Sequence, residues 1–390
     1  MKRISILGCT GSIGRQTLAV VDAMPGRFGL VALAGGENVA LLAEQVERHR
    51  PQLVSTATAA RAKELHELLR QARIDPMPAI ASGAEGMERV ATHTDAEMLV
   101  SAAVGVVGLP ATYAAVQAGK TIALANKEVL VAAGELVTEA ARKNKVDLLP
   151  VDSEHNAIHQ CLRAGRRNEV KRLVLTASGG PFRQTPLYKL QRVTPEEALN
   201  HPNWKMGKRI TVDSATLVNK GFEVIEAHWL FGMRADQIEV VIHPQSIVHS
   251  LVEFVDGSVV AQMGPPDMRL PIQYALTYPD RFASNGVSLD WAKLKKLEFE
   301  APSLRKFPCL GLAWDALRAG GVQPCAFNAA DEVAVAAFLE GRIAFIAIAP
   351  VIESVMKQMP GSTPGSIAAV LAADREARRL ASEQVARQRA

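Results

Sequence analysis

Cysteine is scarce in this chain of 390 residues, which holds only four, and no two of them form a CxxC pair. Cys9, Cys161, Cys309 and Cys325 are scattered along the chain, which argues against a zinc knuckle or a disulfide-stapled scaffold. No dense stripe of basic residues is interleaved with aromatic ones, and the formal net charge is only +4. We therefore expect no nucleic-acid partner, and the cysteine usage fits a reducing cytosol.

Long apolar segments are also lacking. The N-terminal run MKRISILGCTGSIG is too short in its apolar part for a signal peptide. The stretch Met98–Ala118 carries no charge and is nearly long enough to span a bilayer, but it contains Gly105, Gly108 and Pro110. A buried strand, turn and helix fits this stretch better. We expect a cytoplasmic protein without a membrane partner.

What the chain does contain is a regular alternation of strand-like and helix-like segments over residues 1–150. The pattern predicts strands at Ile4–Leu7, Leu30–Ala34, Met98–Val100, Thr121–Ala125 and Asp147–Val151, and helices at Ser12–Met24, Val39–His49, Ala59–Gln71 and Thr112–Ala118. Strands that alternate with helices form a mostly parallel sheet with helices on both faces. The expected fold is α/β, with an N-terminal Rossmann-like, doubly wound sheet.

After residue 150 the pattern changes. Strands are expected at Lys171–Ala177, Glu239–Ile242, Ile247–Phe254 and Ser258–Met263, the last two joined by a hairpin turn at Asp256-Gly257. This predicts a central α+β domain with an open sheet over residues 151–284. Residues 285–308 resemble a linker, and helical patterns at Ala313–Ala319, Ala329–Leu339, Ile343–Lys357 and Ile367–Arg387 predict a C-terminal helical bundle over 309–390.

The stretch GCTGSIG follows the first expected strand and opens a helix. Its glycines, Gly8, Gly11 and Gly14, let the backbone turn sharply and approach a pyrophosphate, which then lies at the helix N-terminus. Strand, loop and helix in this order favour dinucleotide binding over an ordinary tight turn. The second strand ends at Glu37, and an acid there usually binds the ribose 2′-hydroxyl. Taken alone, Glu37 indicates NAD.

Two acids, Asp152 and Glu154, follow an apolar run and precede a helix. They suit a helix N-terminus, where the dipole stabilises acids, and they equally suit a cation bound between them. A Mg²⁺ or Mn²⁺ ion would need a third oxygen ligand, for which Glu223 and Glu226 are the candidates. We favour Glu223 because it shares a helix face with the polar residue Asn219.

Several anion-binding side chains occur near these acids in the sequence. Ser178 begins a Ser-Gly-Gly turn after a strand, and Ser214, Asn219 and Lys220 offer a hydroxyl, an amide and a cation at a helix start. Each of them, taken singly, is more often a cap or a solvated residue. Their concentration favours a phosphate monoester as the ligand.

The motifs GCTGSIG, LANKE (124–128), VDSEHNAI, TASGGPF, HPNWKMGKRITVDSATLVNKG, HPQSIVHS and GPPDMR together resemble the 1-deoxy-D-xylulose 5-phosphate reductoisomerase family. The resemblance extends, in order, from the first strand to at least Asn328. It implies a homodimeric, NADPH-dependent enzyme of the non-mevalonate isoprenoid pathway that yields 2-C-methyl-D-erythritol 4-phosphate. The reaction is a metal-assisted rearrangement of the carbon skeleton followed by hydride reduction.

The resemblance also implies roles for individual residues. The catalytic set is Lys127, Asp152, Glu154 and Glu223, of which the three acids hold Mg²⁺ or Mn²⁺. The substrate is bound by Lys127, Ser153, Glu154, Ser178, His201, Trp204, Ser214, Asn219, Lys220 and Glu223, with Trp204 in a lid over His201–Gly207. NADPH is bound by Thr10, Gly11, Ser12, Ile13, Gly36, Asn38, Asn126, Glu128 and Gly207.

At Glu37 the local rule and the resemblance disagree. We side with NADPH, and expect Glu37 to turn outward while Lys208 or Arg209 supplies positive charge when the lid closes. Two alternatives remain. A semialdehyde dehydrogenase would need a nucleophile, for which Cys161 lacks an obvious base. A metal-dependent sugar-phosphate isomerase or aldolase would carry out no redox step.

Overall fold

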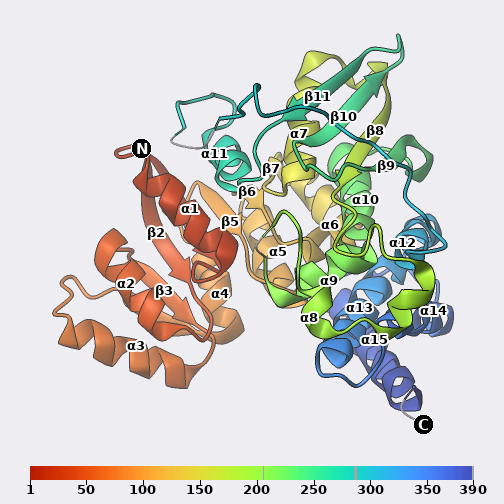
Figure 1. The fold of residues 1–390 in the computed structure, drawn as a ribbon. Coiled ribbons are helices and arrows are strands. Elements are labelled where there is room, and N and C mark those ends of the chain that lie inside the picture. The colour runs from red at the N-terminus through yellow and green to blue at the C-terminus, as the bar shows by residue number, and fades with distance from the viewer. Residues whose placement is uncertain (205, 285–287, 389–390) are drawn as a thin grey trace. The chain divides into compact units, whose positions relative to one another are not determined.

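The computed structural model describes residues 1–204, 206–284 and 288–388, which fold into two compact units (Figure 1). The first unit comprises Met1–Val129, Val137–Asn156 and Asp267–Gly286, and the second comprises Leu130–Leu136, Ala157–Pro266 and Val287–Ala390. Each unit is thus built from segments that are not consecutive in the chain. The division into four parts after residues 150, 284 and 308 stays a prediction.

The first unit is organised around a seven-stranded parallel sheet in the order β4-β3-β2-β1-β5-β6-β7. Its strands are β1 (Lys2–Leu7), β2 (Phe28–Ala34), β3 (Leu53–Thr56), β4 (Ala79–Ser82), β5 (Met98–Ser101), β6 (Thr121–Leu124) and β7 (Leu148–Pro150). From β1 the chain winds outward to β4 and then returns to β5 on the other side of β1. Because such crossovers are right-handed, this reversal places helices on both faces of the sheet. The predicted doubly wound sheet is confirmed.

The helices of this unit are α1 (Ser12–Asp22), α2 (Val39–His49), α3 (Ala59–Gln71), α4 (Gly83–Ala91), α5 (Leu109–Gln117) and α11 (Arg269–Thr277), while α6 (Glu128–Asn144) and α7 (Ser153–Cys161) have residues in both units. Side-chain caps begin α2 and α3. The side chains of Asn38 and Thr58 accept the N–H groups of Leu41 and Arg61 in the first turns of α2 and α3. These caps fix the points where the two strand-to-helix loops end.

The core of the first unit lies against its sheet. Ile4, Ile6 and Leu33 are fully buried, and they belong to one apolar cluster with Ile272 and Leu276 of α11. A segment some 270 residues further along the chain therefore completes the packing of the N-terminal strands. No helix among the described residues is long and apolar enough to cross a membrane. The charge-free stretch Met98–Ala118 forms β5, a short 3-10 turn and α5, as expected.

The second unit contains an open four-stranded sheet in the order β11-β10-β8-β9. Its strands are β8 (Val170–Ala177), β9 (Ile238–Ile242), β10 (Val248–Phe254) and β11 (Val259–Met263). β10 is antiparallel to β8 and β11, whereas β8 and β9 are parallel, so the sheet is mixed. The predicted hairpin is present, with Gly257 in the left-handed region at φ 88°.

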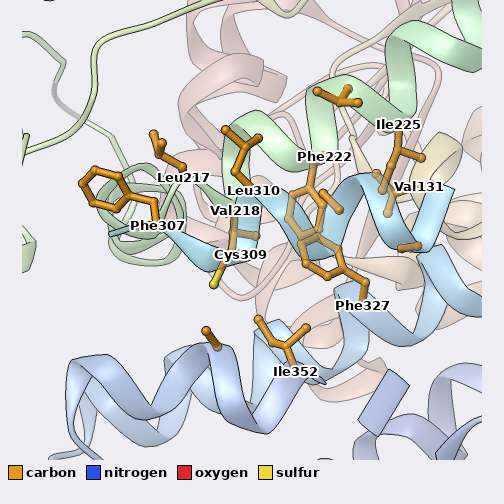
Figure 2. Packing of buried hydrophobic residues seen from close by; sticks show 14 of the residues in the cluster. Val131, Leu217, Val218, Phe222, Ile225, Phe307, Cys309, Leu310, Phe327 and Ile352 are labelled. Carbon is orange, nitrogen blue, oxygen red and sulfur yellow. The ribbon is translucent and has the colours of Figure 1, made fainter. Parts of the chain in front are cut away.

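The helices of the second unit pack into one apolar core with this sheet. They are α8 (Pro195–Ala198), α9 (Lys208–Thr216), α10 (Val218–Phe231), α12 (Pro308–Ala319), α13 (Gln323–Leu339), α14 (Ile348–Gln358) and α15 (Ile367–Arg387). Figure 2 shows Phe222 of α10 and Phe327 of α13 in contact, and their ring centroids are 5.5 Å apart in an edge-to-face arrangement. The predicted C-terminal helices are therefore confirmed.

Several elements were not predicted. β3 and β4 have four residues each, too few for a periodic pattern, and the helices α4 and α6, with 9 and 17 residues, were also not predicted. Of the predicted linker, residues 285–287 lie outside the described part of the chain. Residues 288–307 contain no helix or strand beyond an isolated bridge of Glu300 to Ile242.

Candidate active site

The glycine loop of the first unit lies between β1 and α1, next to the end of β5. Gly8 has a φ of 78°, and a Cβ atom there would lie 2.3 Å from the carbonyl oxygen of Ala102. A Cβ on Gly14 would lie 2.3 Å from the carbonyl oxygen of Gly8. Both positions therefore exclude a side chain. Gly11 is the N-cap of α1 and offers no side chain to the first N–H groups of the helix, so these can donate to an anion.

Most of the residues predicted to bind the dinucleotide follow neighbouring strands of one parallel sheet. Thr10, Gly11, Ser12 and Ile13 follow β1, Gly36 and Asn38 follow β2, and Asn126 and Glu128 follow β6. The carboxyl ends of parallel strands form one edge, and the strand order reverses between β1 and β5, where such folds bind ligands. Gly207, the N-cap of α9, belongs to the second unit.

Asn126 is almost completely buried beside this edge. Its amide nitrogen donates to the carbonyl oxygens of Ala103, at 2.5 Å, and Gly105, at 3.0 Å. Its amide oxygen is buried and accepts no hydrogen bond from the described residues. A buried acceptor without a donor costs free energy, which a donor group of a bound ligand would recover. The residues at this edge therefore fit a dinucleotide.

The acidic pair follows β7. Asp152 accepts a hydrogen bond from the backbone N–H of Glu154 at 3.2 Å, so it caps the start of α7. Asp152 also forms an ion pair with Lys127, which precedes α6. The hydroxyl of Ser153 donates to Glu154 at 2.6 Å, and His155 lies 3.7 Å from Asp152. The capping interpretation is thus correct for Asp152.

Glu223 belongs to the second unit and is fully buried on α10. One of its carboxylate oxygens accepts a hydrogen bond from Asn219 at 2.6 Å, and the other pairs with Lys220, which is also buried. Buried charges persist in folded proteins when they are paired or bind a metal. The helix face shared by these three residues, expected from their spacing, is present.

The side chains predicted to bind the phosphate lie on the turn after β8, at the end of α9 and at the start of α10. A Cβ on Gly180 would lie 2.6 Å from the carbonyl oxygen of Ser214, so the turn that begins at Ser178 lies directly against the end of α9. Leu217 has a φ of 62° and separates the two helices, and this places Asn219 and Lys220 in the first turn of α10. The structure therefore brings Gly180 against Ser214, 34 positions later in the sequence.

His201 joins this group through Ser178. Its Nδ1 atom accepts backbone N–H groups from Asn203, at 3.1 Å, and Trp204, at 3.0 Å. The other ring nitrogen, Nε2, therefore carries the proton of a neutral ring and donates to the Ser178 hydroxyl at 3.0 Å. Because burial lowers the pKa of His201, the neutral form is favoured. Ser178 also accepts from the N–H of Gly180, so its own hydroxyl proton remains for a ligand.

Trp204 is half-buried in the loop before α9, and its ring centroid lies 6.5 Å from that of His249. Beside it, the amide of Asn203 donates to the carbonyl oxygen of Pro244 and to the hydroxyl of Ser246. The loop is thus held at Asn203 on the β9–β10 connection. The predicted lid over His201–Gly207 includes residue 205, which lies outside the described residues, and the lid stays a prediction.

Cys161 does not have the surroundings of a reactive cysteine. It is buried in α7, and burial raises its pKa to about 11. Burial thus favours the thiol over the reactive thiolate, which weighs against the semialdehyde dehydrogenase alternative.

The sequence analysis missed Arg61, which forms an ion pair with Glu37 at 2.8 Å. Glu37 is exposed, as expected. The positive charge beside Glu37 comes from Arg61 of the same unit. Arg209, one of the two residues expected to supply this positive charge, pairs instead with Glu332 at 3.0 Å. Because β3 was not predicted, nothing indicated that the helix that carries Arg61 follows a strand next to β2.

Comparisons with known proteins show the family of this chain. Residues 4–134 match the family model described as 1-deoxy-D-xylulose 5-phosphate reductoisomerase, and residues 148–231 match the model of its C-terminal domain. Residues 263–380 match the DXP reductoisomerase C-terminal domain. A protein of that name from Pelotomaculum thermopropionicum is 52% identical over 380 residues, which cover 97% of each chain. The chain belongs to the 1-deoxy-D-xylulose 5-phosphate reductoisomerase family.

Further members support this assignment. The reductoisomerase of Chlorobium limicola is 53% identical over 98% of this chain and 99% of its own. The solved structure of the Zymomonas mobilis enzyme in complex with NADPH has a TM-score of 0.92 and 42% identity, and covers 98% of this chain and 99% of that one. A reductoisomerase solved with NADPH, fosmidomycin and magnesium has a TM-score of 0.93 and 41% identity, with 99% and 98% covered.

Proposed function

We propose that this protein converts 1-deoxy-D-xylulose 5-phosphate to 2-C-methyl-D-erythritol 4-phosphate in isoprenoid biosynthesis, with NADPH and Mg²⁺ as cofactors. The observation that carries this conclusion is the match to reductoisomerases of known name over nearly the whole chain, at about half of all positions. The protein is an NADPH-dependent oxidoreductase. An isomerase or aldolase without a redox step is not favoured, because the glycine loop keeps the features that a dinucleotide requires and related structures contain NADPH.

NADPH is bound by residues that follow β1, β2 and β6, together with Gly207. These are Thr10, Gly11, Ser12, Ile13, Gly36, Asn38, Asn126, Glu128 and Gly207. The N–H groups at the start of α1 suit the pyrophosphate, and the unsatisfied amide oxygen of Asn126 suits a donor such as the carboxamide of the nicotinamide.

The divalent cation is held by Asp152, Glu154 and Glu223. These three side chains form a group of acids, among the described residues, that could hold a metal ion. Carboxylate oxygens suit hard ions such as Mg²⁺, and we extend the proposal to Mn²⁺. When bound, the cation supplies a Lewis acid that stabilises negative charge on substrate oxygens.

Two lysines neutralise the acids of this set, because Lys127 pairs with Asp152 and Lys220 with Glu223. Lys127 and Ser153 also contact the substrate oxygens between which the carbon skeleton rearranges. An ammonium group beside these oxygens lowers the free energy of an oxyanion in the transition state.

The substrate phosphate is bound by Ser178, Ser214, Asn219 and Lys220, with His201 beside them. The hydrogen bonds that Ser178 accepts from His201 and Gly180 orient its hydroxyl proton outward as a donor. A neutral His201 does not compete with Lys220 as the cation of this group. The loop with Trp204 covers the substrate and excludes water, which strengthens each of these interactions.

The parts of the chain divide these tasks. Residues 1–150 bind NADPH, and residues 151–284 carry the catalytic residues and the dimer contacts. Residues 285–308 form a linker to the C-terminal helical domain, residues 309–390. The enzyme acts as a homodimer in the cytoplasm.

The function is tested by incubating the purified protein with 1-deoxy-D-xylulose 5-phosphate, Mg²⁺ and NADPH, and identifying the product by NMR. The expected product is 2-C-methyl-D-erythritol 4-phosphate, formed in equal amount to the NADPH oxidised. A rearranged or cleaved sugar phosphate that forms at the same rate without NADPH would instead establish the isomerase or aldolase activity.

A further inference from the structure

Glu37 occupies the position at the end of β2 where an acid usually accepts the ribose 2′-hydroxyl and selects NAD. In this structure its carboxylate accepts a hydrogen bond from Nε of Arg61 at 2.8 Å. Both side chains are largely exposed, with 65% of Glu37 and 42% of Arg61 accessible. The acid is therefore paired with a cation at the place where it would repel a 2′-phosphate.

The topology of the sheet brings Arg61 to this position. β2 and β3 are parallel neighbours, and their ends are joined by hydrogen bonds from Gly35 N–H to Ser55 and from Ala57 N–H to Gly36. Thr58 then caps α3, which places Arg61 in the first turn of that helix. The loop that carries Glu37 is thus adjacent to the start of the helix that carries Arg61, because β2 and β3 are paired.

Arg61 has donors left for a ligand. Its Nε donates to Glu37, and its Nη1 donates to Glu64 at 2.7 Å on the same helix. Its Nη2 donates no hydrogen bond within the described part of the chain. The neighbouring Gly36 is exposed, and a Cβ there would meet nothing within 4 Å, which leaves room for a phosphate group.

We propose that Arg61 is the residue that selects NADPH over NADH, by neutralising Glu37 and donating to the 2′-phosphate of the adenosine ribose. A guanidinium group recognises phosphate through paired N–H donors, and an arginine near this position is a known way to accommodate a 2′-phosphate. The inference rests on the proposed use of NADPH and names the residue that determines it.

The test compares cofactor binding, without substrate, in the full-length wild type, Arg61→Ala and Arg70→Ala. Arg70 is a matched control, since it is exposed on the same helix and also pairs with a glutamate three residues away, Glu67, at 2.9 Å. Binding of NADPH and NADH is followed by nicotinamide fluorescence. Adenosine 2′,5′-bisphosphate and ADP serve as competitors that differ in the 2′-phosphate.

Arg61→Ala is expected to weaken NADPH and adenosine 2′,5′-bisphosphate by at least about tenfold, the size of one lost hydrogen bond to a charged group. NADH and ADP should bind as before or more tightly, and Arg70→Ala should change nothing. Equal weakening of NADPH and NADH, or no change in either, overturns the role of Arg61. A wild type that itself prefers NADH overturns the use of NADPH, so the two failures are distinguishable.

Discussion

The two regions that we propose bind anions are built in opposite ways. The glycine loop of the first unit offers backbone N–H groups, and its Gly8 and Gly14 leave no room for side chains. The region in the second unit offers side chains, among them the hydroxyl of Ser178 and the buried ammonium of Lys220. A backbone site needs residues that are adjacent in the chain, whereas a side-chain site can collect residues from distant segments.

This difference determines how each region responds to mutation. The backbone site is sensitive to added atoms, because any side chain displaces the loop. The side-chain site is sensitive to removed atoms, because each lost donor leaves a phosphate oxygen or a buried carboxylate without its partner. Mutations that add atoms to the backbone site or remove atoms from the side-chain site test this difference.

The largest effect is expected for the acids proposed to hold the divalent cation. Asp152→Asn and Glu223→Gln should each lower turnover by at least roughly two orders of magnitude, because each removes a charged metal ligand. The Kd of NADPH should barely change, since its phosphates bind at the first region. Steady-state kinetics in excess Mg²⁺ and an NADPH titration measure the two effects.

Glu226→Gln is the control for these variants, because Glu226 was the alternative third ligand and is buried on the same helix. It should leave the concentration of Mg²⁺ needed for half-maximal activity unchanged. If Glu223→Gln kept near-full activity and Glu226→Gln needed more Mg²⁺, Glu226 rather than Glu223 would be the third metal ligand.

A crossed pair of variants gives the next largest effect. Gly14→Ala places a Cβ 2.3 Å from the carbonyl oxygen of Gly8, and should weaken NADPH roughly tenfold through the displaced loop. Ser214→Ala removes one phosphate donor and should raise KM for the substrate by about tenfold. Each variant should leave the other ligand's binding unchanged. A loss of both ligands in either variant would show that the two regions are not independent.

The same contrast explains how much of the molecule could be predicted. The glycine loop was found from the chain alone, because Gly8, Gly11 and Gly14 are local and the strand and helix around them are regular. The bounds of α2, α3 and α15 were predicted correctly from their apolar periodicity. The link between Ser178 and His201 depends on tertiary packing, and only the resemblance to a family indicated it.

The role of Arg61 could not be predicted from the sequence. Its ion pair with Glu37 follows from the pairing of β2 with β3, and β3 is a four-residue strand whose sequence carries no clear alternation. Sheet neighbours cannot be assigned to a strand that is not predicted. The local rule for Glu37 indicated NAD because it could not include a residue from the next helix.

A smaller effect is expected at the loop over the second region. Trp204→Ala should lower kcat because the loop no longer excludes water, while the fold remains intact. Trp229→Ala is a matched comparison, because its indole packs against the core, where a Cβ on Gly134 would lie 2.1 Å from it. Deletion of a core tryptophan costs about 3–5 kcal/mol of stability. If Trp204→Ala lowered Tm as far as Trp229→Ala, Trp204 would be structural.

The smallest effect is expected at Glu37. Glu37→Lys adds a cation beside Arg61, which keeps its pairing with Glu64 at 2.7 Å. NADPH should bind several-fold more tightly at low salt, and the gain should shrink at high salt because exposed charges are screened over roughly 10 Å at 0.1 M ionic strength. Weaker NADPH binding by this variant would mean that Glu37 orients Arg61 rather than merely opposing the phosphate.

The central claim is that one enzyme couples a metal-dependent rearrangement to oxidation of NADPH. Its most direct test follows NADPH absorbance after 1-deoxy-D-xylulose 5-phosphate is added to the purified protein. Steady oxidation should stop when excess EDTA is added and return when Mg²⁺ is restored, with NADPH binding unchanged throughout. Oxidation of NADPH that continues at full rate in EDTA, or no oxidation with the metal present, would contradict the account.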